Sequence, residues 1–124
     1  MIELMIKREE LAKGQVLFSE GDQCRNMYVI SKGEISLTKE KNGLSIEVAV
    51  LNEGEFLGEM ALLTDSARTC TATAKTETSL LIYDEDEFRE LIRTNNGVAL
   101  RIIEGLAQRL ENTTEKLLVP LEII

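Results

Sequence analysis

Short apolar stretches separated by glycine-bearing turns run from residue 2 to about residue 83. Residues 35–38, Ile-Ser-Leu-Thr, alternate apolar and polar side chains with the two-residue period of a half-buried strand. The Asn42-Gly43 pair follows soon after, and it supplies the positive φ angles that a tight hairpin turn needs. Many short strands at such regular spacing predict a closed or sandwiched antiparallel β structure.

The hydrophobic period changes at Asp84, and two helices are expected beyond it. Asp84 with Glu87 three residues later is typical of a helix start, which predicts a short helix over about 85–93. An Asn-Asn-Gly run at 95–97 breaks that helix and can cap the next one. A long helix is therefore expected over about 97–118.

The long helix carries a seam of side chains with heptad spacing. Its members alternate in steps of four and three residues, and they are Ala99, Ile103, Leu106, Leu110, Thr113 and Leu117. A helix of this length is longer than is needed to pack against one small β domain. The seam therefore favours a homodimer through residues 98–118. Packing of the stripe onto the chain's own β domain is the alternative. Pro120 is expected to end the helix.

Length and charge limit the class of protein. A chain of 124 residues is large enough for one core, so residues 1–124 are expected to form a single domain. The net charge of −8 repels polyanions, which argues against nucleic acid as a partner. No apolar run approaches the thickness of a bilayer, and the first residues carry charges. The sequence therefore predicts a cytoplasmic protein without a membrane partner.

The lack of histidine narrows the possible chemistry. The sequence contains no histidine and two isolated cysteines, Cys24 and Cys70. Catalysis by a Ser-His or Cys-His pair is therefore excluded within one chain, and a four-cysteine iron–sulfur cluster lacks its ligands. An enzymatic function, a metal and a cofactor are accordingly not expected. The cysteines are interpreted as small core or loop residues, with a disulfide as the alternative.

Residues 58–69 hold the side chains with the clearest chemical meaning. Gly58 permits close approach of the backbone, so that the amides from 58 to 62 can point at an anion. Arg68 carries a planar fork that suits a phosphodiester, and Glu59 is an acceptor suited to a ribose 2′-hydroxyl. Taken singly, these residues also fit a turn glycine and a surface salt bridge.

Together these residues form a specific motif. Residues 56–63, Phe-Leu-Gly-Glu-Met-Ala-Leu-Leu, are followed after four residues by Arg-Thr-Cys-Thr-Ala at 68–72. This pattern resembles the phosphate-binding cassette of the cyclic-nucleotide-binding domain family, which includes bacterial cyclic AMP receptor proteins and protein kinase regulatory subunits. The resemblance covers nearly the whole chain. It implies a mainly β fold with α: an antiparallel, double-stranded, jelly-roll-like β-roll over about 2–83, then a short and a long helix.

The resemblance also implies a set of ligand contacts. Glu59 would accept the ribose 2′-hydroxyl, and Arg68 would bind the cyclic phosphate. Further contacts are implied for the backbone amides of Gly58, Met60 and Ala61 and for the hydroxyl of Thr69. Thr113 and Thr114 fall where the dimer helix of the receptor proteins contacts adenine, although threonines that simply end an apolar stripe fit equally well.

The function implied by the resemblance is a regulatory or sensor domain. Thr113 and Thr114 favour cyclic AMP, whereas Thr69, directly after the arginine, leaves cyclic GMP open. Occupancy would pass through the C-terminal helices to an effector protein or domain that the sequence does not identify. No helix-turn-helix follows Lys116, so a free-standing sensor or one domain of a longer chain is expected. The alternative is a structural, dimerising module with a vestigial pocket.

Overall fold

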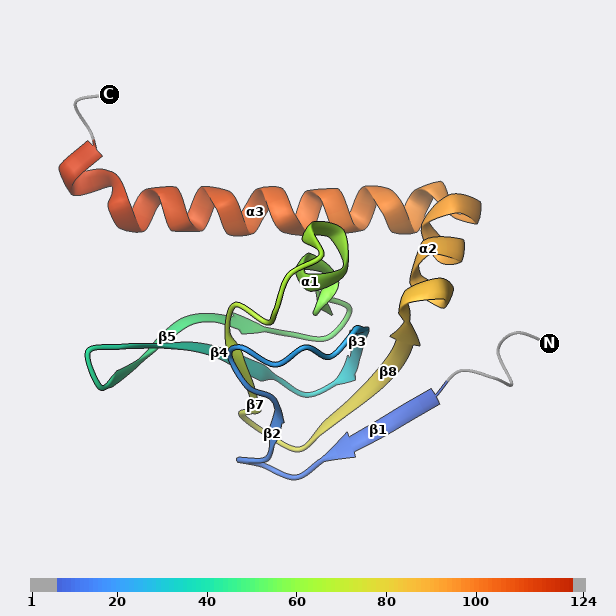
Figure 1. The fold of residues 1–124 in the computed structure, drawn as a ribbon, viewed down its shortest axis with the longest axis horizontal. Helices are drawn as coiled ribbons and strands as arrows, with labels where there is room; N and C mark the ends of the chain where they lie inside the picture. Colours follow the sequence, from blue (N-terminus) through green and yellow to red (C-terminus); the bar gives the residue numbers. More distant parts are fainter. Residues whose placement is uncertain (1–6, 122–124) are drawn as a thin grey trace. The chain divides into compact units, whose positions relative to one another are not determined.

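The short apolar stretches form two antiparallel sheets. The computed structural model describes the backbone of residues 7–121 and the side chains of residues 7–112, and contacts divide the chain after Phe88 into a β unit and a helical unit. The strands are β1 Lys7–Leu11, β2 Val16–Phe18, β3 Asn26–Lys32, β4 Ile35–Lys41, β5 Leu44–Leu51, β6 Phe56–Leu57, β7 Thr71–Ala74 and β8 Thr78–Asp84. One sheet has the order β1-β8-β3-β6 and the other β2-β7-β4-β5 (Figure 1). This arrangement confirms the predicted β-roll.

The core of the β unit lies between the two sheets. Apolar side chains from both sheets are buried together, namely Leu11, Phe18, Tyr28, Ile30, Ile35, Leu51, Leu57, Ala72, Ala74 and Leu80. Full burial of each large member contributes about 1.5–3 kcal/mol, so these positions account for much of the stability of the roll. Ile35 is buried as the two-residue period predicted, but Ser36 next to it is buried as well, and Leu37 is only partly buried.

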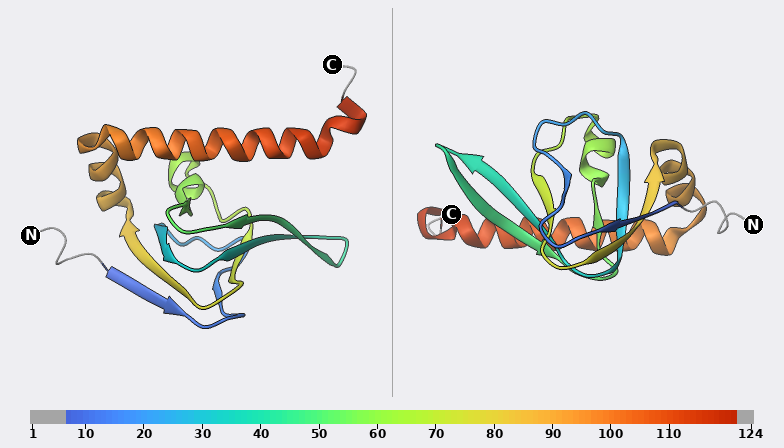
Figure 2. Two further views of the ribbon diagram at one scale, coloured as in Figure 1. Left: turned by 180° about the vertical axis from the view of Figure 1, so that it is seen from behind. Right: turned by 90° about the horizontal axis from the view of Figure 1, so that it is seen from below.

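The hairpin between β4 and β5 has the predicted turn. Asn42 and Gly43 adopt φ angles of 55° and 79°, as the central pair of a type I′ turn requires. In both views of Figure 2 this hairpin extends beyond the other strands of its sheet. Leu44 and Ile46, near its tip, are exposed.

A short helix, α1 at Glu59–Thr64, follows β6. The sequence predicted backbone amides here that could point at an anion, as at the amino end of a helix, but it did not predict a helix. The helix ends at Asp65, which adopts a left-handed conformation with φ 53°, and the Ser66 amide donates to the Ala61 carbonyl at 3.0 Å. The cassette is thus a small folded element rather than an open loop.

Two helices follow the last strand, α2 at Glu85–Thr94 and α3 at Asn96–Leu121. The start of α2 is the predicted capping box, because the Asp84 amide donates to Glu87 at 2.9 Å and the Glu87 amide donates to Asp84 at 2.8 Å. The helix α3 continues one residue past Pro120 instead of ending before it. Only Leu121 follows Pro120 in α3, so the proline still lies at the end of the helix, within the one or two residues to which a helix end is defined.

The predicted seam on α3 is partly visible. Ile103 and Leu110, one heptad apart, are exposed, and so is Leu100. Thr113 and Leu117 lie outside the residues whose side chains are described. No helix within residues 7–121 combines the length and the apolar character that crossing a membrane requires.

Candidate functional site

Gly58 joins β6 to α1 in a conformation that favours glycine. Its φ is 86° and its ψ is −7°, in the left-handed region. A Cβ atom at this position would lie 2.8 Å from Nη1 of Arg68 and 2.9 Å from the carbonyl oxygen of Asn26. Both the backbone angle and the close approach of a guanidinium therefore require glycine here.

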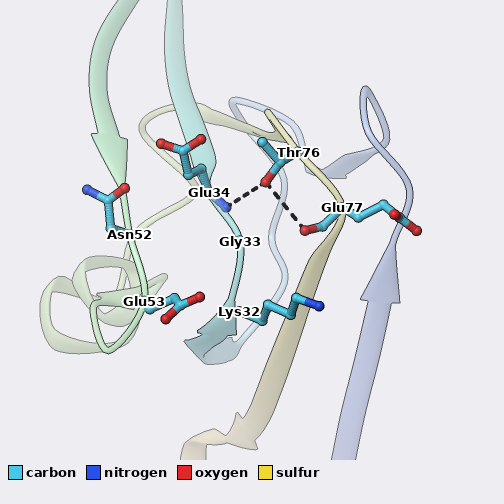
Figure 3. Close-up of a pocket in the computed structure, with 7 residues that line it drawn as sticks. All are labelled: Lys32, Gly33, Glu34, Asn52, Glu53, Thr76 and Glu77. Carbon is cyan, nitrogen blue, oxygen red and sulfur yellow. Dashed lines mark hydrogen bonds between the residues drawn. The ribbon is translucent and has the colours of Figure 1, made fainter.

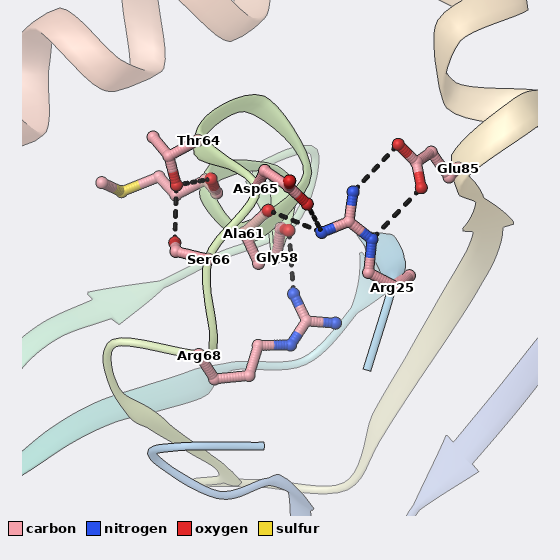
Figure 4. A network of polar contacts seen from close by, with 9 residues as sticks. Arg25, Gly58, Ala61, Thr64, Asp65, Ser66, Arg68 and Glu85 are labelled. Carbon is pink, nitrogen blue, oxygen red and sulfur yellow. Dashed lines mark hydrogen bonds and ion pairs between the residues drawn. The ribbon is translucent and has the colours of Figure 1, made fainter. Parts of the chain in front are cut away.

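Arg68 lies almost completely buried beneath the start of α1. The residue is only 3% exposed. Its Nη1 donates to the Gly58 carbonyl at 2.8 Å (Figure 4), and its Nη2 donates to the Asn26 carbonyl at 2.5 Å. The guanidinium carbon lies 4.3 Å from the centre of the Phe18 ring, a cation–π contact. Within the described residues, Nε of Arg68 is buried without a hydrogen-bond acceptor.

The backbone of Arg68 is held by the turn between β2 and β3. The Arg68 amide donates to the Asp22 carbonyl at 2.9 Å, and the Gly21 amide donates to the Arg68 carbonyl at 2.8 Å. The ammonium of Lys39 donates to the Thr69 carbonyl at 2.8 Å. The end of the cassette is therefore fixed by residues distant in sequence.

Glu59, the first residue of α1, is buried to 1% exposure. Full burial of a glutamate is rare in proteins and requires compensating polar interactions. Its position in the first turn of α1 is favourable, because the amino end of a helix attracts negative charge. The cassette thus contains one buried carboxylate and one buried guanidinium.

The other predicted contact residues differ in exposure. Met60 is 43% exposed, whereas Ala61 is 4% exposed. Thr69 is exposed at the end of the cassette. Thr113 and Thr114 lie outside the residues whose side chains are described, so the structure does not place them at the site.

Arg25 is a residue of this region that sequence reasoning missed. It precedes β3, and its guanidinium forms a two-pronged pair with Glu85 at 3.1 and 2.9 Å. Its Nη1 also donates to Asp65 at 2.8 Å and to the Ala61 carbonyl at 3.3 Å (Figure 4). Hydrogen bonds to Glu85 raise the pKa of Arg25 above its ordinary value. No motif marks this residue, because its partners are 36 to 60 positions away.

Tyr28 forms part of the wall around Arg68. Its ring stacks on Phe18 at a centroid distance of 6.2 Å and lies 6.0 Å from the guanidinium carbon of Arg68. Burial, with a smaller contribution from Cys24, raises the pKa of Tyr28 to about 12. The phenol therefore remains neutral at physiological pH, and it adds no negative charge beside the guanidinium.

A second polar hollow lies at the other end of β3. We call it the acidic groove, and it is lined by Lys32, Gly33, Glu34, Asn52, Glu53, Thr76 and Glu77 (Figure 3). Three carboxylates face one ammonium in this lining, so the groove disfavours an anionic ligand. Its hydrogen bonds are local: the Glu34 amide donates to the Thr76 hydroxyl at 3.1 Å, and that hydroxyl donates to the Glu77 carbonyl at 3.4 Å.

Residues 7–112 contain no group of three or more histidine, cysteine or acidic side chains that could hold a metal ion. Cys24 and Cys70 are free thiols, as the core or loop interpretation expected.

Comparison with known proteins points to one family. A family model described as "Cyclic nucleotide-binding domain" matches residues 8–95. The chain is 31% identical over 102 residues to the cAMP-activated global transcriptional regulator CRP of Salmonella typhimurium, covering 81% of this chain and 49% of CRP. It is also 31% identical over 111 residues to lysophospholipase nte1 of Neurospora crassa, covering 88% of this chain but 7% of that protein. The chain therefore spans half or less of the length of these relatives.

A solved structure agrees with the sequence matches. The EAL enzyme Bd1971 in its cAMP-bound form superposes with a TM-score of 0.67 and 28% identity, covering 94% of this chain and 32% of that chain. Its cGMP-bound form superposes with a TM-score of 0.68 and 29% identity, covering 94% of this chain and 32% of that chain. The β-roll described above is therefore similar to domains that occur in both regulators and enzymes.

Proposed function

Because the chain belongs to the cyclic-nucleotide-binding domain family, we propose that it is a regulatory domain that binds cyclic AMP in the cassette of residues 58–69. The observation that carries this proposal is the burial of two opposite charges, Glu59 and Arg68, at 1% and 3% exposure within one short segment. Burying charge is costly unless it serves the fold or a ligand. A vestigial cassette would be free to lose such groups.

Arg68 fits the cyclic phosphate. Its Nε is buried without an acceptor within the described residues, and its two Nη donors meet neutral backbone carbonyls. A phosphodiester oxygen carries negative charge, so its hydrogen bond with a guanidinium adds the attraction of an ion pair, which a neutral carbonyl lacks. A bound phosphate would therefore compete well for this guanidinium.

The remaining contacts follow from the position of α1. The amides of Gly58, Met60 and Ala61 belong to the first turn of this helix or precede it, where backbone donors are not used by the helix itself. They can supplement Arg68 on the phosphate. Glu59 would accept the ribose 2′-hydroxyl, and the exposed Thr69 hydroxyl would contact the phosphate or the base.

The choice of base rests on hydroxyl groups. We favour cyclic AMP over cyclic GMP because Thr113 and Thr114 are placed by sequence where the receptor proteins contact adenine. Thr69 keeps cyclic GMP as the second candidate. Bd1971, which is similar to this chain, has been solved in a cAMP-bound and a cGMP-bound form, which supports keeping both nucleotides as candidates.

The domain would act as a regulator rather than as a catalyst. Ligand would stabilise one arrangement of the cassette and thereby bias α2 and α3, which an effector protein or domain then reads. The exposed Ile103 and Leu110 support pairing of α3 with a second copy of the chain. Neither nucleic acid nor a membrane is proposed as a direct partner.

A thermal-shift scan across cyclic nucleotides tests this function. A ligand that binds only the folded state adds about 2.7 kcal/mol of stability at a hundredfold excess over Kd. Cyclic AMP should therefore raise the Tm by several degrees, and cyclic GMP should raise it less. An unchanged Tm with both nucleotides would leave the structural, dimerising module as the better description.

A further inference from the structure

Arg25 links the cassette helix to the start of α2. We propose that Arg25 is a positioning residue through which nucleotide binding at Arg68 is transmitted from α1 to the first turn of α2. This inference rests on the proposed function, since it concerns the regulation exerted by the same site.

The contacts of Arg25 reach α1 and the first turn of α2, which both belong to the β unit. Its Nε and Nη2 pair with both carboxylate oxygens of Glu85, the first residue of α2. Its Nη1 meets Asp65 and the Ala61 carbonyl at the last turn of α1 (Figure 4). A planar guanidinium with donors on several edges can join two groups in fixed geometry, which a lysine cannot do.

Arg25 is also the neighbour in sequence of Asn26, whose carbonyl accepts a hydrogen bond from Arg68. Nη2 of Arg68 donates to the carbonyl of Asn26, the residue that follows Arg25. Nη1 of Arg68 donates to the carbonyl of Gly58, immediately before α1. The helix α1 is therefore held at its beginning by Arg68 and at its end by Arg25.

A phosphate that engages Arg68 would change this arrangement at both ends. Turning the guanidinium toward the phosphate weakens its hydrogen bonds to Gly58 and Asn26, because the same donors serve the stronger acceptor. The Gly58 end of α1 and the Asn26 peptide are then free to adjust. Arg25 carries both displacements to Glu85. Its guanidinium is hydrogen-bonded to α1, and its backbone is joined directly to Asn26.

The chain contains a matched arginine that lacks this connection. Arg93 also forms a two-pronged pair, with Glu90 at 2.7 and 3.2 Å, and hydrogen bonds to Glu90 raise its pKa as well. Both partners of that pair lie within α2, three positions apart, so it stabilises the helix without joining it to the cassette. The variant Arg93→Met therefore shows the general effect of losing an ion pair in α2, against which the specific effect of losing the contacts of Arg25 can be compared.

Hydrogen exchange at amides 85–94 of the full chain, with and without saturating cyclic AMP, tests the proposal. In the unaltered chain and in Arg93→Met, cyclic AMP should change the protection of these amides to the same extent. In Arg25→Met, cyclic AMP should still bind, with an affinity shifted by about fivefold because coupling is reciprocal. The protection change at 85–94 should be lost in this variant.

Glu85→Gln gives a second view of the same link from the other side. It keeps the shape of the side chain and removes its charge, so it should reduce the protection change at 85–94. In a double variant with Arg25→Met, it should cause no further loss of that protection change. A full change at 85–94 in Arg25→Met, or no change in an unaltered chain that binds cyclic AMP, would overturn the inference alone. Absence of binding to the unaltered chain would overturn the proposed function and the inference with it.

Discussion

The cassette and the acidic groove are two polar regions at opposite ends of β3, and they handle charge in different ways. In the cassette, Glu59 and Arg68 are almost fully buried, and Arg68 is held by backbone carbonyls and an aromatic ring. In the groove, Lys32, Glu53 and Glu77 are exposed to solvent. The groove is a hollow in the surface, and its exposed charges remain solvated, so they cost little free energy.

This difference shows why a hollow in the surface, such as the acidic groove, is not sufficient to identify the ligand-binding site. Water screens exposed charges, so the groove offers weak and unspecific attraction to a ligand. Buried groups in the cassette lie in a less polarisable environment, where each hydrogen bond to an anion is stronger. The cassette is therefore the better candidate, and the difference can be tested by altering each region in the same way.

The largest effect is expected from Arg68→Lys. Lysine keeps the positive charge but loses the planar fork and the stacking on Phe18, so the affinity for cyclic AMP should fall by about 100-fold, which corresponds to the loss of two charge-assisted hydrogen bonds. Equilibrium dialysis with labelled nucleotide measures this directly. Lys32→Met, which removes the ammonium of the groove, is the matched control and should leave the affinity unchanged. Equal affinity of Arg68→Lys and the unaltered chain would remove Arg68 from the site.

Two glycines allow the same substitution in both regions. Gly58 and Gly33 have φ angles of 86° and 97°, and a Cβ at either position would press on neighbouring atoms. Gly58→Ala and Gly33→Ala should therefore each lower the free energy of unfolding by about 1–3 kcal/mol, as measured by urea denaturation. Only Gly58→Ala should also weaken cyclic AMP binding. If both variants weakened it alike, the effect would come from general destabilisation and not from the cassette.

Glu59→Gln should have a smaller effect than the change of Arg68. The amide keeps the shape of the side chain but is a weaker acceptor than the carboxylate, so affinity should fall by about tenfold. Titration with 2′-deoxy cyclic AMP supplies the check, since this ligand lacks the hydroxyl that Glu59 would bind. The unaltered chain should lose affinity for the deoxy ligand, and Glu59→Gln should lose little more. An additive loss would assign Glu59 another role.

The smallest effect is expected from the carboxylates of the groove. Glu53→Gln and Glu77→Gln alter exposed side chains, and such substitutions usually change stability by no more than about 0.5 kcal/mol. Cyclic AMP affinity, followed by the same dialysis assay, should stay within about twofold, because screening weakens charges at this distance from the cassette. A tenfold change would show that the groove takes part in binding.

Sequence patterns were sufficient for the roll, but not for the helix α1 or for the contacts that hold Arg68 in place. The Asn42-Gly43 turn and the Asp84–Glu87 cap were predictable because each depends on neighbours within three residues. The partners of Arg68 were not, since Asn26 lies 42 positions away and offers only its backbone carbonyl. Arg25 was missed for the same reason. The end of α3 was predicted from Pro120 to within one residue, because Pro120 lies next to the last residue of the helix.

Isothermal titration of the unaltered chain with cyclic AMP, with 5′-AMP as the control ligand, tests the central claim most directly. The two ligands share the base and most of the ribose, but only the cyclic one presents the ring phosphate that Arg68 and the amides of α1 are proposed to bind. The expected result is saturable binding of cyclic AMP at one site per chain and at least about 100-fold weaker binding of 5′-AMP. No saturable heat with cyclic AMP or cyclic GMP, or equal affinity for 5′-AMP, would contradict a phosphate site in this cassette.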